Sequence, residues 1–460
     1  MATLAIHGHF YQPDRRDPIT GIIPADPTAA PAHDWNQRIY EQCYAPNARQ
    51  GNFARIGYDF GPTLLTWLRS QYPGLHAAIA MQSAGESAMA SGWHHAILPL
   101  SLPRDRWTEI HWGVTDFAFR FGHAPTGFWM PETAVDENTL CSIVDAGIRY
   151  VILAPWQASG PLDTRRPYRV ELPGDRHIIA VFYDGDLSSK VSFEDEATAN
   201  ADRFVREYVC PRSGRLPDGS EPLLLVATDG ELYGHHKMFR DHFLRALPEA
   251  CARAGMVMTP LGDVVAKLHA ADLPTISITY GTSWSCHHGL ARWSTGCECT
   301  PDSRWKPILR KALNNLAEVL DTASEQAFDQ LGLDIWDLRD RYIVVAAGYA
   351  DAGDFAAAAL AGSPWADDPS SIEIVCGLLA AQRSRLAMFT SCGWYWADPS
   401  RGETVMCLKY AADAIERVRR LTGVDAESAF VRTLRPLRSA SGEGGDALYR
   451  RALSEMISGE

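Results

Sequence analysis

The stretch Pro222-Leu-Leu-Leu-Val-Ala-Thr-Asp229 is a near-continuous hydrophobic run that ends at a carboxylate. Runs of this kind are typical of strands that are buried on both faces of a parallel sheet. A second apolar run, Gly127-Phe-Trp-Met-Pro-Glu132, also ends at a carboxylate, and Pro131 favours an extended Met130. In a barrel of alternating strands and helices, side chains at the C-terminal strand ends point into the active site. Both carboxylates are therefore candidates for one site.

Short β-type runs recur along the first part of the chain, with helical segments between them. We expect strands at residues 3–7, 76–82, 126–130, 149–154, 177–183, 222–228 and 275–279. Helices are expected between them at residues 113–121, 138–146 and 239–254. This alternation predicts an α/β protein with a parallel, βα-type barrel.

After residue 300 the sequence becomes rich in Ala, Leu, Arg and Glu. Helices are expected at residues 304–325, 370–389, 403–421 and 426–437, with an ambiguous run at 342–346. A chain of 460 residues exceeds what one core usually supports. We therefore expect a catalytic barrel with loop insertions over residues 1–300 and an α-helical C-terminal domain over 301–460.

The composition of the chain limits the classes of binding partner and the cellular compartment that we expect. A net charge of −13 argues against nucleic acid and against an anionic membrane surface. The start Met-Ala-Thr-Leu-Ala-Ile-His shows no signal peptide, and no apolar stretch is long enough to span a bilayer. The ten scattered cysteines are expected to be reduced thiols. These features predict a cytoplasmic enzyme, and they leave its oligomeric state open.

Four motifs occur in order along the chain. They are His7-Gly-His9, Gly92-Trp-His94-His95, Trp129 three residues before Glu132, and Asp229-Gly-Glu231-Leu-Tyr233-Gly234. Together they resemble glycoside hydrolase family 57. The resemblance implies an incomplete (β/α)7 barrel with a helical C-terminal region and a retaining enzyme for α-1,4-linked glucans or malto-oligosaccharides. It also implies that Glu132 is the nucleophile, that Asp229 is the acid/base and that no cofactor is needed.

The two carboxylates suit this chemistry on physical grounds as well. A retaining enzyme needs one ionised carboxylate and one protonated acid, roughly 5–5.5 Å apart. The acid keeps its proton near neutral pH if it is desolvated or lies near another negative charge. Either water or a second sugar can accept the glycosyl group, so hydrolysis and transglycosylation both remain open.

Further polar and aromatic side chains are candidates for binding the sugar. Those expected to bind substrate are His7, His9, His94, His95, Trp129, Glu231, His235, Trp284 and Trp394. The histidines also permit an alternative, a metal-dependent carbohydrate enzyme of the deacetylase or mannosidase kind. A third alternative is a glucan-binding protein without catalysis. We expect substrate-binding histidines and no catalytic metal.

A separate group of thiols and imidazoles follows Trp284. Cys286-His-His288 and Cys297-Glu-Cys299 lie within fourteen residues of one another. They could form a structural zinc site or a disulfide. The spacing differs from that of common zinc ribbons, and we expect a loop that shapes the active site.

Overall fold

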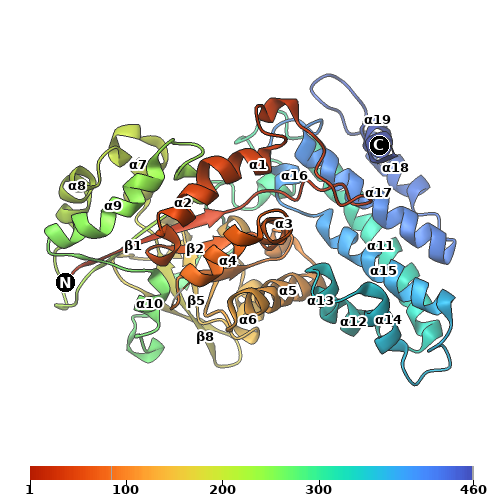
Figure 1. Cartoon of the computed structure of the whole chain (residues 1–460), viewed down its shortest axis with the longest axis horizontal. Helices are drawn as coiled ribbons and strands as arrows, with labels where there is room; N and C mark the ends of the chain where they lie inside the picture. Colours follow the sequence, from red (N-terminus) through yellow and green to blue (C-terminus); the bar gives the residue numbers. More distant parts are fainter. Residues whose placement is uncertain (84, 458–460) are drawn as a thin grey trace. The chain divides into compact units, whose positions relative to one another are not determined.

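The computed structural model describes residues 1–83 and 85–457. These residues form two compact units (Figure 1). Unit 1 comprises residues 1–12, 25–93 and 113–285, and unit 2 comprises residues 13–24, 94–112 and 286–460. Unit 2 therefore starts its long segment before residue 300 and also includes two short segments from the N-terminal half of the chain.

A parallel sheet forms the centre of unit 1. In the described residues its seven parallel strands follow the order β9-β1-β2-β3-β4-β5-β8. Their bounds are β1 (Thr3–Phe10), β2 (Gly57–Phe60), β3 (Ala88–Ser91), β4 (Gly127–Trp129), β5 (Tyr150–Leu153), β8 (Arg176–Phe182) and β9 (Leu223–Asp229). Just beyond β8, the backbone N–H of Asp184 donates to the carbonyl of Leu225 in β9 at 2.7 Å, so the two ends of the sheet approach each other. The predicted incomplete (β/α)7 barrel is confirmed.

Short strands extend this sheet. The strand β10 (Val257–Met258) pairs with the start of β1, and β7 (Tyr168–Leu172) pairs antiparallel with β8. Two further strands, β6 (Ala158–Ser159) and β11 (Ser277–Ile278), form a separate pair.

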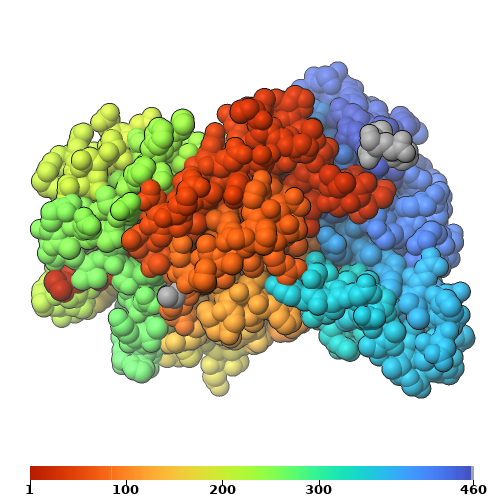
Figure 2. All heavy atoms as spheres, in the orientation of Figure 1, coloured from red at the N-terminus to blue at the C-terminus, as the bar shows by residue number. Residues whose placement is uncertain are grey.

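Helices surround the sheet of unit 1 (Figure 1). They are α1 (Trp35–Ile39), α2 (Ala45–Arg49), α3 (Pro62–Gln71), α4 (Pro73–Gln82), α6 (Glu137–Asp145), α7 (Gly185–Phe193), α8 (Ala201–Phe204), α9 (Arg240–Arg253) and α10 (Leu261–Val265). Asp136 shows how the sequence starts such a helix, because its side chain accepts the N–H of Thr139 at 2.8 Å. Residues 25–82, red to orange in Figure 2, form much of the surface of unit 1 in that view.

One strand prediction was wrong, a second strand lies outside the barrel, and two strands of the barrel were missed. Residues 76–82 belong to α4, where Pro73 occupies the first turn and an apolar, Ala-containing run continues the helix. Residues 275–279 contribute to β11, outside the barrel. The missed strands β2 and β3 have four residues each, and β2 carries the buried Asp59 instead of a hydrophobic pattern.

Unit 2 is helical, as predicted. Its helices are α11 (Trp305–Leu331), α12 (Ile335–Arg341), α13 (Ile343–Ala346), α14 (Ala352–Leu360), α15 (Pro369–Ala387), α16 (Cys392–Tyr395), α17 (Gly402–Thr422), α18 (Glu427–Leu434) and α19 (Gly445–Ile457). The ambiguous run at 342–346 is helical. The helix α5 (Pro103–Phe121) is continuous, and its residues up to 112 belong to unit 2. The helices α11, α15 and α17 pack against one another.

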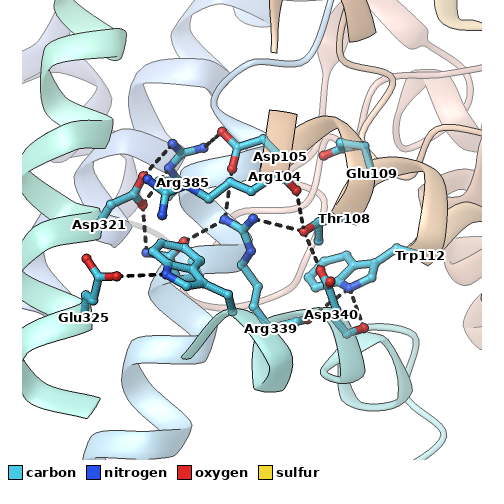
Figure 3. A network of polar contacts seen from close by, with 12 residues as sticks. Arg104, Asp105, Thr108, Glu109, Trp112, Asp321, Glu325, Arg339, Asp340 and Arg385 are labelled. Atoms are coloured by element: carbon cyan, nitrogen blue, oxygen red, sulfur yellow. Dashed lines mark hydrogen bonds and ion pairs between the residues drawn. The ribbon is translucent and has the colours of Figure 1, made fainter. Parts of the chain in front are cut away.

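A buried ionic network connects α5 with the helices of unit 2 (Figure 3). Asp105 accepts hydrogen bonds from Arg339 and Arg385, and Arg385 binds both oxygens of Asp321 at 3.0 and 2.8 Å. The indole N–H of Trp112 donates to the carbonyl of Arg339 at 3.0 Å. Each buried charge in this network thus has a partner of opposite sign, which is the arrangement that makes its burial tolerable.

Candidate active site

Three neighbouring strands of unit 1 align an imidazole with two carboxylates. The register of β1 pairs His9 with Asp59 on β2 and with Asp229 on β9. Adjacent strands lie about 4.8 Å apart, so these residues form a row at the C-terminal ends of their strands. This edge is where barrel enzymes place their catalytic groups.

Asp59 is bonded to both histidines of β1. Its carboxylate lies 3.0 Å from His7 Nε2 and 2.8 Å from His9 Nδ1, and all three residues are buried. Both imidazoles therefore lie on the same face, as expected for residues two apart on an extended strand. Burial alone would lower the pKa of His9, but Asp59, Asp229 and Glu231 raise it to about 9. His9 is thus a cation near neutral pH, whereas burial lowers the pKa of His7.

Trp129 supports these imidazoles. Its ring stacks on His7 and on His9 with centroid distances of 5.0 and 4.9 Å. The ring is fully buried, which does not support direct stacking of a sugar on Trp129. Trp284 packs edge-on against Trp129 at 4.9 Å and is only half-buried, so it is the better candidate for contact with a sugar ring.

The backbone at Glu132 is strained. Glu132 and Thr133 have φ values of 58° and 47°, in the left-handed region that a Glu or a β-branched Thr rarely adopts. Such residues cost on the order of 1–3 kcal/mol each and persist where the surroundings enforce them. Gln157 provides that enforcement, because its amide accepts from the Thr133 hydroxyl at 2.9 Å and donates to the Thr133 carbonyl at 2.8 Å.

Two side-chain donors hold the carboxylate of Glu132. The Ser285 hydroxyl and the Trp284 indole N–H donate to Oε2 at 2.6 and 3.1 Å. Burial raises the pKa of Glu132 and Asp229 adds to this rise, whereas Ser285, Trp284 and His9 favour the ionised form. Both bonds end on Oε2 and neither involves Oε1.

Asp229 is exposed at the end of β9. Partial burial raises its pKa, while the charges of His9 and His236 oppose this rise. The following Gly230 allows a close approach, because a Cβ there would lie 2.4 Å from the ring of Phe10. The charge of Asp229 contributes to the raised pKa of Glu132, and the separation of roughly 5–5.5 Å between the two carboxyl groups stays a prediction.

Glu231 is enclosed two residues beyond Asp229. Its Oε1 accepts from the Tyr44 hydroxyl at 2.7 Å and from the backbone N–H of Tyr11 at 3.1 Å. Burial, with a contribution from Asp229, raises the pKa of Glu231 to about 7. This buried carboxyl is positioned to hold Tyr44 and the end of β1 rather than to meet solvent.

The other predicted binding residues have partners outside the barrel cluster. His94 and His95 belong to unit 2, where they are buried and bond to Glu109 and to Ser391, each at 2.7 Å. Trp394, also in unit 2, is fully buried against Arg310, so direct contact with sugar is not supported in this structure. His235 is half-buried in unit 1 and bonds to Gln42 at 2.6 Å, and burial lowers its pKa to about 4.

Three residues with clear roles were missed in the sequence. Asp59 orients both histidines, Ser285 binds Glu132, and Tyr44 binds Glu231. A buried carboxylate within the short run Gly57-Tyr-Asp-Phe60 is the signal that could have revealed Asp59. Ser285 stands beside the predicted Trp284, and Tyr44 gives no local signal.

One group of potential metal ligands is found among residues 1–83 and 85–457. It consists of Cys286, His288, Cys297 and Cys299 in unit 2. The imidazoles of His7 and His9 are instead directed to Asp59. The absence of a catalytic metal stays a prediction.

Glu132, which accepts two hydrogen bonds, and the exposed Asp229 both lie at the C-terminal edge of a parallel barrel. This pair of carboxylates is typical of a glycoside hydrolase. A model described as "Glycosyl hydrolase family 57" matches residues 2–277, and one described as "Domain of unknown function (DUF3536)" matches residues 302–458. The first match covers more than half of the chain. The chain therefore belongs to glycosyl hydrolase family 57.

Solved structures and a curated protein are similar to this chain. An exo-type maltose-forming amylase from Pyrococcus sp. ST04 matches with a TM-score of 0.74 at 14% identity, covering 98% of this chain and 89% of that one. A GH57-type branching enzyme from Pyrococcus horikoshii matches with a TM-score of 0.61 at 13% identity, covering 99% and 94%. Identities this low show a shared fold. "Alpha-amylase 1" from Dictyoglomus thermophilum is 28% identical over 123 residues, which are 25% of this chain and 18% of that protein.

Within the described residues, no helix combines the length and apolar character needed to cross a bilayer.

Proposed function

We propose that this protein is a retaining glycoside hydrolase or transglycosylase that acts on α-1,4-linked glucans or malto-oligosaccharides by double displacement. Glu132 is the nucleophile and Asp229 is the acid/base. The observation that carries this assignment is the contrast between the two groups. Glu132 is half-buried and held by two donors, whereas Asp229 is exposed and makes no ion pair with Lys or Arg in the described part of the chain.

The first half of the reaction follows from these positions. Oε1 of Glu132 attacks the anomeric carbon, and the bond from that carbon to the glycosidic oxygen breaks. Asp229 gives its proton to the departing oxygen, which releases the sugar on that side. The hydrogen bonds from Ser285 and Trp284 favour the ionised Glu132 that attack requires.

The second half uses Asp229 in the opposite direction. Asp229, now ionised, takes a proton from water or from a sugar hydroxyl as that oxygen attacks the glycosyl–Glu132 ester. The cationic His9 lies beside Asp229 in the sheet register and favours its ionised form. Water as acceptor gives hydrolysis, and a sugar gives transglycosylation.

The activities for which the similar proteins are named support an α-glucan as substrate. They are an α-amylase, a maltose-forming amylase and a branching enzyme. The half-exposed Trp284, whose indole reaches Glu132, provides an aromatic surface at the bond to be cleaved.

The proposal is tested with malto-oligosaccharides, soluble starch, pullulan and a β-linked glucan as control. Products are separated by chromatography, and NMR reads the anomer that forms first. We expect α-configured products from α-1,4-linked substrates and none from the β-glucan, with all activity lost in Glu132→Gln. First-formed β-anomers would contradict the retaining mechanism, and full activity of Glu132→Gln would contradict the site.

A further inference from the structure

The loop that begins at Cys286 gathers three thiols and an imidazole around one point. Cys286 Sγ lies 3.6 Å from Cys297 Sγ and 3.9 Å from Cys299 Sγ, and His288 Nδ1 lies 3.2 Å from Cys299 Sγ. All four potential ligand atoms lie within 4.8 Å of one another. We propose that these four residues form a structural site for a single zinc ion, distinct from the carboxylates that act on the sugar.

The separations fit a tetrahedral ion. With Zn–S bonds of about 2.3 Å, two sulfurs on one tetrahedral zinc lie about 3.8 Å apart. A disulfide would instead require about 2.05 Å between two sulfurs, and all ten cysteines are free. A set of three thiolates and one imidazole closes all four positions, which is characteristic of a structural zinc rather than a catalytic one.

Hydrogen bonds from neighbouring groups surround the four proposed ligands. The N–H groups of His288 and Cys299 donate to the sulfurs of Cys286 and Cys297. The hydroxyl of Ser303 donates to the carbonyl of Cys297 at 3.2 Å. Hydrogen bonds of this kind orient metal ligands and are a regular part of a metal site.

A buried cation supplies independent support from charge. The ammonium of Lys306 is fully buried and donates to the Thr300 hydroxyl at 2.9 Å, and it forms no carboxylate ion pair within the described residues. The three cysteine side chains interact electrostatically with it. Zinc with three thiolates and a neutral imidazole has a formal net charge of −1. This negative charge would compensate the buried ammonium of Lys306.

The site has a consequence for Glu132, which rests on the proposed function. Cys286 directly follows Trp284 and Ser285, the two residues that donate to the Glu132 carboxylate. Zinc would therefore fix the end of the segment that positions the nucleophile. His288, Cys297 and Cys299 are positioning residues in this scheme and take no part in the reaction.

Metal analysis of the purified full-length protein tests the site without reference to activity. Protein is produced in medium supplemented with zinc chloride, and bound metals are measured by mass spectrometry. We expect one zinc per chain in wild type and in His287→Ala, and a loss of at least tenfold in His288→Ala and Cys297→Ser. His287 is the matched control, because it is the adjacent exposed imidazole outside the cluster.

Replacement of zinc by cobalt provides a second readout that needs no variant. Cobalt in this site should give thiolate charge-transfer bands and the intense visible bands of a tetrahedral ion, absent in His288→Ala. Wild-type protein without stoichiometric metal, or with a disulfide among these cysteines in freshly purified reduced protein, would overturn the proposal. Zinc that is lost in His9→Ala but retained in His288→Ala would place the metal at the barrel histidines instead.

Hydrogen exchange tests the positioning role. When zinc is removed by a chelator, amide exchange should rise in residues 281–300 and stay unchanged in β1 and β9. The kcat on a malto-oligosaccharide should fall in parallel, and readdition of zinc should restore both. Restored exchange protection without any glucan activity in wild type would refute the proposed function and leave the zinc site standing. Unchanged exchange on zinc removal would refute the positioning role.

Discussion

Two groups of carboxylates in this molecule compensate their charge in different ways. The barrel cluster comprises Asp59, Glu132, Asp229 and Glu231, and the arginine network comprises Asp105, Asp321, Arg339 and Arg385. In the described residues, the barrel cluster forms ion pairs only through the histidines of β1, whereas each carboxylate of the arginine network binds an arginine. Both groups are polar, but only the barrel cluster is suited to exchange protons.

The directions of the pKa shifts follow from this difference. Burial would raise the pKa of Asp105, but Arg385 and Arg339 hold it below its usual value. Within the described residues, Glu132, Asp229 and Glu231 form no ion pair with an arginine, and burial raises the pKa of all three. Carboxyl groups with raised pKa values that lie close together are typical of catalytic sites, whereas neutralised pairs stabilise a fold. The comparison therefore assigns chemistry to unit 1 and a structural role to the network in unit 2.

The largest expected effect comes from removing the nucleophile. Glu132→Ala should lower kcat/KM on the order of 10⁴-fold, because no other group can form the glycosyl intermediate. Asp229→Ala should lower activity on a natural glucan about 10²–10⁴-fold but affect an activated aryl glycoside much less, since that leaving group needs little protonation. Initial rates on both substrates provide the measurement.

Azide separates the two roles further. It should partly restore Asp229→Ala by intercepting the intermediate, and an α-glucoside should give the α-glycosyl azide because two inversions restore the configuration. The assignments would have to be exchanged if Glu132→Ala showed the leaving-group dependence instead.

Asp105→Asn tests the other side of the comparison. Breaking a buried ion pair costs about 3–5 kcal/mol, because Arg339 would lose the one ion pair it forms within the described residues and Arg385 would keep only its pair with Asp321. We expect a clearly lower melting temperature with the same ratio of activities on natural and activated substrates as in wild type. Asp337→Asn, which removes an exposed pair with Arg341, should leave the melting temperature unchanged. A changed activity ratio in folded Asp105→Asn would contradict the division between chemistry and structure.

The sequence predicted the parts of the molecule whose signals are local. Glu132 and Asp229 each end an apolar run, and His7 and His9 lie two apart on one strand, so their positions could be inferred from spacing. The role of Asp59 was not predicted, because its strand has only four residues and a buried carboxylate interrupts the hydrophobic pattern. The arginine network joins residues as far apart as Asp105 and Arg385, and no local pattern predicts such a pairing.

The aromatic residues that were expected to bind sugar differ in burial. Trp129 and Trp394 were expected to bind sugar, yet both are fully enclosed, whereas Trp284 is partly open. The type of a residue and its distance from a motif do not reveal whether its ring faces solvent or a core, because this depends on packing between distant elements.

A smaller effect is expected at Glu231, where the sign depends on pH. Its folded pKa of about 7 exceeds the ordinary value of 4.5, so its stabilising contribution is complete below pH 4.5 and is lost as the pH rises through 7. In Glu231→Gln the side chain cannot ionise, so this loss of stability with rising pH is absent. Relative to wild type, the variant should gain up to about 3 kcal/mol of unfolding free energy between pH 4.5 and pH 8, read from urea denaturation. Exposed Glu318→Gln is the control, and an equal pH dependence in Glu231→Gln and wild type would contradict the raised pKa.

The smallest effect concerns the two donors that hold Glu132. Ser285→Ala and Trp284→Phe each remove one hydrogen bond to Oε2 and leave the other in place. A bond to a charged group contributes about 1.5–3 kcal/mol, and since one donor remains we expect the lower end, about a tenfold loss in kcat/KM. Ser285→Ala should lose more, because its bond of 2.6 Å is shorter than the 3.1 Å bond of Trp284. Both bonds lower the pKa of Glu132, so each variant should also shift the acidic limb of the pH profile of kcat/KM to higher pH. Ser142→Ala on α6 should shift nothing. An acidic limb that stays in place in both active-site variants would mean that another group than Glu132 must be ionised for the reaction, and the barrel cluster would then need a different nucleophile.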